Sequence, residues 1–536
     1  MRGSTARSLL SARNILLLGA ALALALALGA ISAGASGRQG GGQLKNGGTL
    51  TIALAEDPDV LDPTLARTFV GRIVFMHICE KLYDLNAKLQ IVPQLAAGMP
   101  RVSADKRTVT IRLRTGIKFN DGTPFNAQAA KISLDRHRTL PLSRRASELS
   151  PVSSVDAVGA RTIVIHLSEP FAPLTAQLAD RAGMVMSPAQ LDKLGGRFGT
   201  NPVCVGPFQF VSRTAGDRIV VKKSPSYYAA KKVHLDQIVF RIINEPSAAA
   251  QALRAHDVDV VDRLGPTELP AIKSDRSLSV LAATSIGYQG ITINIGNKNG
   301  LLKLPYQNTG TMLAAHKNLR QAFELAIDRR LLNRVVFQGQ VQPGCGPIAP
   351  TSPWFDRSIP CNARADVARA KRLVAQSGVR SPTIRLMIGN DALAARLGEF
   401  LQAQERQAGI NVELQPTEFV SSLAKADAGQ YEAFAIGWSG RVDPDGNIYQ
   451  FVHTKGSQND SGYSNPRLDV ILDNARHAKS ERARKTLYRA AIRIIRSDRP
   501  LIYLYHTVTR DGVSKKVGGI KLFGDGLIRA QFAALK

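Results

Sequence analysis

Helical and strand-like patterns alternate through the carboxy-terminal half of this 536-residue chain. Apolar side chains recur at helical spacing from Leu319 to Val335, over 367–376 and over 397–408, and a strand pattern follows at 411–414. A glycine follows the second and the third of these predicted helices, as is common at helix ends. Such alternation is typical of layers in which helices cover a sheet. We therefore predict an α/β fold.

The amino-terminal half has a different make-up, because strand and turn patterns dominate it. Apolar and polar residues alternate from Thr108 to Arg114, and a turn sequence follows at 120–124. Further strands are predicted at 49–54, 162–167, 218–222 and 237–243. The chain is therefore expected to form two unlike lobes and not one repeated domain.

The first 35 residues have the layout of a secretory signal. Three arginines precede an uncharged stretch from Ile15 to Ala35, and Ala33-Gly34-Ala35 offers the small residues of a cleavage site. An uncleaved anchor is the alternative, since 21 uncharged residues are just long enough to span a bilayer. The glycine-rich segment 36–48 then resembles a flexible linker. We expect export without a lipid anchor, because the first cysteine is Cys79.

The chain is strongly basic, with 70 Lys and Arg against 42 Asp and Glu and a net charge of +28. Such a balance is compatible with a nucleic-acid partner, but the signal segment argues against that class. The densest basic stretch, from Arg467 to Arg499, has apolar residues at helical spacing. We interpret it as an amphipathic helix with a solvated basic face, with a dedicated anion-binding surface as the alternative.

No familiar catalytic or cofactor motif is present. The sequence lacks a dinucleotide or phosphate-binding glycine loop, and it has neither an H-E-x-x-H pair nor a C-x-x-C pair. Gly437 to Arg441 departs from a hydrolase nucleophile elbow because Arg441 replaces the second glycine. We therefore expect no enzyme, no cofactor and no metal site. A secreted hydrolase on a two-lobed scaffold is the rival interpretation.

The segment from Arg112 to Ala127 reads RLRTGIKFNDGTPFNA. It resembles the signature of family 5 of the bacterial extracellular solute-binding proteins, the oligopeptide, dipeptide and nickel receptors of ABC importers. The other matches keep the family's order from about residue 49 to about residue 510, and they include Leu61-Asp62-Pro63, Gly206-Pro207-Phe208, Ala326-Ile327-Asp328-Arg329, Gly437-Trp438 and Ser461 to Pro466.

The resemblance implies a bilobal, type II periplasmic-binding-protein-like fold with an additional domain inserted in the first lobe. Lobe one then comprises 49–80, 202–285 and 503–536, the inserted domain 81–201, and lobe two 286–502. A peptide-like or other small polar solute is captured by hinge closure, and the closed form is recognised by the ABC permease. We expect a monomer. The sequence leaves the solute open among peptide, opine, sugar and metal chelate.

The loop after Gly437-Trp438 lines the cleft in this family, and peptide-binding members keep an acidic residue there. Here Arg441 falls on or beside that position, which favours an anionic ligand group, and Asp443 is a substitute acid if the loop shifts. An Arg441 solvated at the cleft rim is the alternative. The predicted ligand-binding residues are Trp438, Ser439, Gly440, Arg441 and Asp443.

The four cysteines suggest at least one disulfide in an exported protein. Cys345 and Cys361 lie in a stretch rich in glycine and proline, which indicates a loop that a bridge could close. We therefore predict that these two residues pair. Cys79 and Cys204 are then left over, and they are expected to pair only if the fold brings them together.

Overall fold

The computed structural model describes residues 45–536, so the predicted signal segment and most of the predicted linker lie outside the described residues. Lys45–Leu535 form one compact unit. Within the described part of the chain, no helix combines the length and the apolar character needed to cross a membrane.

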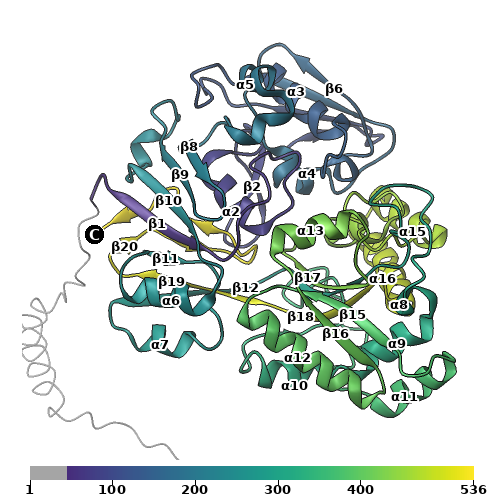
Figure 1. Ribbon diagram of the computed structural model, residues 1–536. Helices are drawn as coiled ribbons and strands as arrows, with labels where there is room; N and C mark the ends of the chain where they lie inside the picture. The colour runs from purple at the N-terminus through teal and green to yellow at the C-terminus, as the bar shows by residue number, and fades with distance from the viewer. Residues whose placement is uncertain (1–44) are drawn as a thin grey trace, which may run out of the picture. The chain divides into compact units, whose positions relative to one another are not determined.

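A seven-stranded sheet is the centre of what we call lobe one (Figure 1). Its central strand β1 carries Leu50, Ile52 and Leu54 inward, and all three are fully buried. β1 runs parallel to β10 and β11, whereas the outer strands pair antiparallel. In sheet order the strands are β12 (Leu278–Thr284), β19 (Val508–Ser514), β11 (Val260–Val261), β1 (Thr49–Leu54), β10 (Gln237–Ile242), β9 (Arg218–Lys223) and β8 (Phe208–Thr214).

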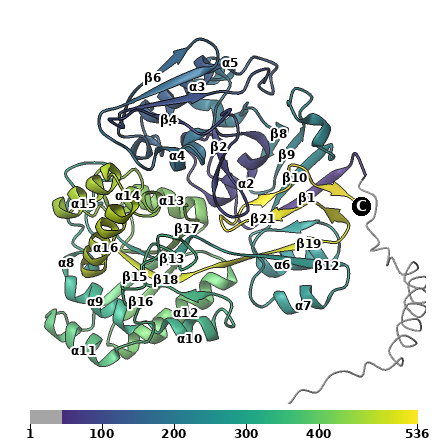
Figure 2. The ribbon, with the colours of Figure 1, turned by 180° about the vertical axis from the view of Figure 1, so that it is seen from behind.

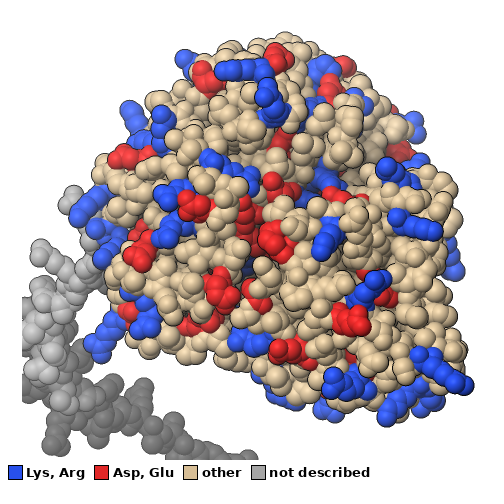
Figure 3. Space-filling model, in the orientation of Figure 1, with Lys and Arg blue, Asp and Glu red and all other residues tan. Residues whose placement is uncertain are grey.

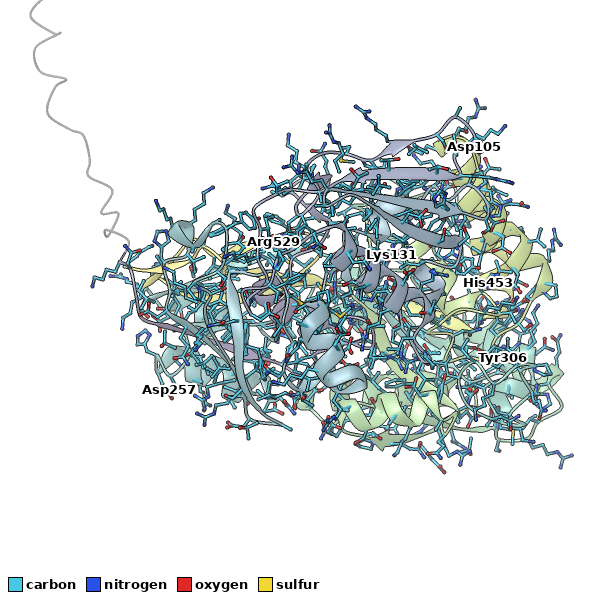
Figure 4. All side chains as sticks on the ribbon, turned by 90° about the horizontal axis from the view of Figure 1, so that it is seen from above. Asp105, Lys131, Asp257, Tyr306, His453 and Arg529 are labelled. Carbon is cyan, nitrogen blue, oxygen red and sulfur yellow. A yellow bond between two sulfur atoms is a disulfide. The ribbon has the colours of Figure 1, made fainter. Side chains whose placement is uncertain are left out.

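Three helices and two short hairpins complete lobe one. The helix α2 is capped by the Thr68 hydroxyl, which accepts from the backbone N–H of Gly71. The helices are α2 (Phe69–Ile78), α6 (Pro246–Arg254) and α7 (Leu269–Ser274), and the short strands are β20 (Val517–Gly518), β21 (Lys521–Leu522), β22 (Ile528–Arg529) and β23 (Ala534–Leu535). Figure 4 labels Arg529, which bonds both carboxylate oxygens of Asp525 beside these strands.

Residues 81–201, between α2 and β8, hold a smaller, four-stranded sheet, and we call this segment the inserted part. Val109 and Ile111 alternate with more exposed residues, as the sequence predicts. In sheet order its strands are β4 (Arg101–Val102), β5 (Thr108–Arg112), β7 (Thr162–Leu167) and β6 (Val152–Val158), with the hairpin β2 (Tyr83–Leu85) and β3 (Ile91–Pro93) beside them. Its helices are α3 (Ala127–Thr139), α4 (Leu174–Gln177) and α5 (Pro188–Leu194).

Lobe two is built on a six-stranded sheet between two sets of helices (Figures 1 and 2). In sheet order the strands are β14 (Gln342–Pro343), β18 (Leu501–His506), β13 (Tyr288–Ile293), β17 (Ala433–Trp438), β15 (Thr383–Ile388) and β16 (Asn411–Pro416). The helices are α8 (Met312–Ala315), α9 (Lys317–Ala326), α10 (Arg329–Val335), α11 (Val367–Gln376), α12 (Ala392–Gln407), α13 (Phe419–Asp427), α14 (Asp445–Val452), α15 (Pro466–His477) and α16 (Glu481–Asp498).

Two neighbouring connections join the sheets of the two lobes. The chain leaves β12 and enters β13 through 285–287, and it returns from β18 to β19 through Thr507. The backbone N–H of Ser285 donates to the carbonyl of Thr507 at 3.0 Å, so the two connections lie side by side. β18 pairs with β13 over Leu501–Tyr505, so residues 503–506 lie in the six-stranded sheet of lobe two. This differs from the sequence-based expectation, which places these residues in lobe one.

Two helical expectations differ from the structure in detail. The stripe from Leu319 to Val335 forms two helices because Asp328 caps α10, with its carboxylate accepting from the backbone of Leu331. The basic stretch 467–499 is likewise two helices. Its basic face is not wholly solvated, since Arg476 is 2 % exposed and Arg484 is 6 % exposed.

All four cysteines lie in pairs within disulfide range. The Cα atoms of Cys345 and Cys361 are 5.4 Å apart, and those of Cys79 and Cys204 are 4.9 Å apart. The structure joins each pair by a disulfide. The second bridge links the end of α2 to the segment that precedes β8.

Candidate ligand-binding site

A cavity of about 410 Å³ is lined by residues from both lobes. Lobe one contributes Glu56 from the end of β1 and Arg263 after β11. Lobe two contributes Asp391 after β15 and Trp438 at the end of β17. The volume is within the usual range for small-molecule sites, which is roughly 300–1,000 Å³. The cavity is therefore the candidate ligand-binding site.

Ion pairs and a hydrogen bond join the lobes beside this cavity, and one pair, Arg67 with Asp460, is buried on both sides. The guanidinium of Arg67, from lobe one, bonds Asp427 and Asp460 of lobe two, each at 2.6 Å. Arg144 of the inserted part also binds Asp427. Gln177 of the inserted part donates to Asp445 of lobe two at 2.9 Å. The structure is thus a closed arrangement in which carboxylates of lobe two meet donors from lobe one and from the inserted part.

Asn447 links two points of the loop after β17. The Oδ1 atom of Asn447 accepts from the Trp438 indole at 3.1 Å and from the backbone N–H of Arg441 at 2.7 Å. Gly440 has a φ of +81°, and a Cβ there would collide with the backbone of Ile286. A glycine is therefore required where the loop passes the connection between the lobes.

Two of the five predicted ligand-binding residues line the cavity, namely Trp438 and Ser439. The Trp438 ring is 7 % exposed and packs edge-on against Phe451 with ring centroids 4.9 Å apart. The Ser439 hydroxyl accepts a hydrogen bond from Arg72 of lobe one at 3.0 Å. Both residues thus line the cavity, and Ser439 also contacts lobe one.

The other three predicted residues, Gly440, Arg441 and Asp443, are not among those that line the cavity. Arg441 is buried beneath the Trp438 ring and bonds Asp180 of the inserted part at 2.9 Å. Asp443 accepts from both terminal nitrogens of Arg484, at 2.7 and 2.8 Å. In this closed structure the two charged side chains of the loop have protein partners, which differs from the expected ligand contacts and from a solvated Arg441.

The charged residues that do line the cavity were not singled out from the sequence. They are Glu56, Asp57, Arg67, Arg263, Asp391, Glu418, Asp460 and Arg510. Glu56 and Asp391 follow the parallel strands β1 and β15, at the carboxyl ends where α/β sheets bind ligands. An acid two or three residues after a buried strand was the available signal for both residues. No comparable signal marks Arg67, whose partners come from the other lobe.

The described part of the chain shows no arrangement suited to a metal ion. Among residues 45–536, no group of three or more His, Cys, Asp or Glu side chains is placed to hold one.

A family model matches residues 90–459, more than half of the chain, and it describes bacterial extracellular solute-binding proteins, family 5. The chain belongs to this family. The family 5 resemblance drawn from the sequence motifs is therefore confirmed.

Glutathione-binding protein GsiB of Pectobacterium atrosepticum is 28 % identical over 499 residues, which cover 90 % of this chain and 93 % of that protein. GsiB of Escherichia coli K12 is 26 % identical over 490 residues, 89 % and 92 % of the two chains.

Solved structures of binding proteins share the fold. The periplasmic binding protein AgaA from A. tumefaciens R10, in complex with agropinic acid, has a TM-score of 0.82 at 24 % identity and covers 91 % of this chain and 99 % of its own. DppA from Helicobacter pylori, in complex with the peptide STSA, has a TM-score of 0.82 at 23 % identity, with coverage of 92 % and 98 %. The bilobal type II fold is thus confirmed, and the hydrolase interpretation finds no support.

Proposed function

We propose that this family 5 protein is the receptor of an ABC importer and captures a small, peptide-like or similarly polar solute in the cavity between its lobes. The observation that carries the proposal is the cavity of about 410 Å³, which is lined from both lobes, with the Arg67 ion pairs joining the lobes beside it. Adjacent connections through 285–287 and Thr507 supply a hinge about which the lobes open and close.

The receptor performs no chemistry on its solute and works as an exported monomer with a membrane permease. The signal-like residues 1–35 support export, and the position of the first cysteine, Cys79, supports the absence of a lipid anchor. Residues 49–285 and 507–536 form lobe one with its inserted part, and 286–506 form lobe two, as the sheet pairing supports. The disulfides also suit an oxidising, extracytoplasmic compartment.

The decisive experiment identifies the solute and asks whether it is bound or converted. Native mass spectrometry of the purified protein detects any solute that copurifies. Calorimetry then compares that solute with reduced glutathione, the peptide Ser-Thr-Ser-Ala and agropinic acid, the ligands named for similar proteins. We expect one solute per chain, recovered unchanged. A solute that is chemically converted, or one that binds without closing the lobes, would overturn the proposal.

A further inference from the structure

The cavity is acidic although the whole chain is basic. Five carboxylates line it against three arginines, whereas the chain carries a net charge of +28. Figure 3 shows acidic side chains gathered near the middle of the face it presents, with Lys and Arg spread over the rest. The lining thus favours a positively charged solute group, provided that its carboxylates are not already neutralised by the protein.

Three of the five lining carboxylates have protein partners. Asp460 binds Arg67 at 2.6 Å, and Asp57 lies 3.0 Å from a nitrogen of Arg213. Glu418 caps α13, with one oxygen accepting from the backbone of Val420 and the other from that of Ser421. The other two are held less fully: Glu56 lies 3.6 Å from Arg263, and Asp391 accepts backbone hydrogen bonds through one oxygen only.

Glu56 shares the guanidinium of Arg263 with one other carboxylate, Asp262. Its carboxylate lies 3.6 Å from Arg263, which bonds Asp262 more closely at 2.9 Å. Asp511 accepts from the backbone N–H of Arg263 as well. Asp262 and Asp511 are both buried, and each keeps one oxygen without a hydrogen-bond partner. Three carboxyl groups thus lie around a single arginine, whose guanidinium contacts two of them.

Asp391 lies on the other side of the cavity, at the amino terminus of α12. Its Oδ1 atom accepts from the backbone N–H groups of Leu393 and Ala394, at 2.9 and 3.0 Å. Within residues 45–536, no Lys, Arg or His forms an ion pair with it. Its second oxygen is available to a ligand. Burial is the main cause that raises the pKa of Glu56; Arg263 opposes the rise, and the charges of Asp262 and Asp391 add to it.

We propose that a positively charged group of the solute, an ammonium or a guanidinium, binds between Glu56 of lobe one and Asp391 of lobe two. This inference rests on the proposed function and adds the charge of the solute. Two carboxylates from opposite lobes repel each other as the lobes approach, and a cation between them reverses the sign of that interaction. The same group therefore supplies both selectivity and the drive to close, because it binds the closed form better than the open form.

Matched solutes test the selectivity. Calorimetry compares reduced glutathione and Ser-Thr-Ser-Ala with their N-acetylated forms, which lack the ammonium. We expect the free amines to bind at least about tenfold more tightly, and Glu56→Gln or Asp391→Asn to remove about that factor. Glu413→Gln, an exposed carboxylate of β16, is the matched control and leaves the affinity unchanged. Equal affinity for both members of each pair, or unchanged affinity in both variants, would overturn the inference and leave solute binding intact.

A second measurement needs no solute. Small-angle scattering compares the solute-free wild type with the Glu56→Gln and Asp391→Asn variants. Since each substitution removes the repulsion between the lobes, we expect a smaller radius of gyration in each variant and an unchanged one in Glu413→Gln. A radius that matches wild type in both variants would contradict the inference, whichever solute the protein proves to bind.

Discussion

Replacing Arg67 with alanine tests whether the ion pairs across the cleft hold the closed form. The guanidinium bonds Asp427 and Asp460 at 2.6 Å each; the pair with Asp460 is buried, whereas the Asp427 side chain is 32 % exposed. Truncating one member of a buried, hydrogen-bonded charge pair costs about 2–5 kcal/mol. Asp427 keeps Arg144 as a partner, and opening the lobes returns Asp460 to water, so we expect the lower end of that range.

A loss of about 2 kcal/mol lowers the equilibrium constant for lobe closure roughly thirtyfold. The apparent affinity for the solute falls with it, because the solute binds the closed form. Calorimetry measures the affinity, and scattering with saturating solute measures closure. Arg67→Lys keeps the charge but loses the planar guanidinium that bonds two carboxylates at once, so its solute affinity should lie between those of wild type and Arg67→Ala. Arg218→Ala removes an exposed pair with Asp217 and is the control, with an expected effect below about 1 kcal/mol. An Arg67→Ala protein that binds within threefold of wild type and closes normally would refute this reasoning.

Three further predictions concern stability and the loop after β17. Burial raises the pKa of Glu80 to about 7 from an ordinary 4.5, so ionisation of this group costs stability as the pH rises through that range. In urea unfolding, wild type should lose about 3 kcal/mol relative to Glu80→Gln between pH 4.5 and pH 7. The same pH dependence of unfolding free energy in both proteins would contradict this. Non-reducing peptide mapping should recover Cys345 joined to Cys361, and breaking that bridge with Cys345→Ser should cost about 3 kcal/mol; thiols that react with iodoacetamide in the folded protein would count against it. Trp438→Ala should weaken solute binding by about 2 kcal/mol in calorimetry while the lobes stay folded, and a change below threefold would exclude this ring from the site.

Local sequence patterns were enough to place many of the elements. β1 and β7 have the predicted bounds, as does α11, because each depends on a periodicity and on end signals within about ten residues. The predicted helix over 319–335 divides at Asp328, because the apolar stripe continues through a residue whose side chain caps a new helix. A periodic stripe alone does not show that interruption.

The binding site was harder to predict, because the partners of its charges are distant in the chain. Arg441 lies in the expected loop, yet its charge is matched by Asp180 of the inserted part. Arg484 has the helical spacing of a solvated face, yet it is buried against Asp443. Residue type and spacing therefore located the loop, whereas which side chains reach the cavity depends on how the lobes pack.

The central claim is that the two lobes close over one small polar solute without altering it. Small-angle scattering of the purified chain, before and after addition of the solute found by native mass spectrometry, tests this most directly. The account predicts a smaller radius of gyration that saturates at one solute per chain, with the solute recovered unchanged. A radius that stays constant at saturation, or a solute recovered as a product, would contradict it.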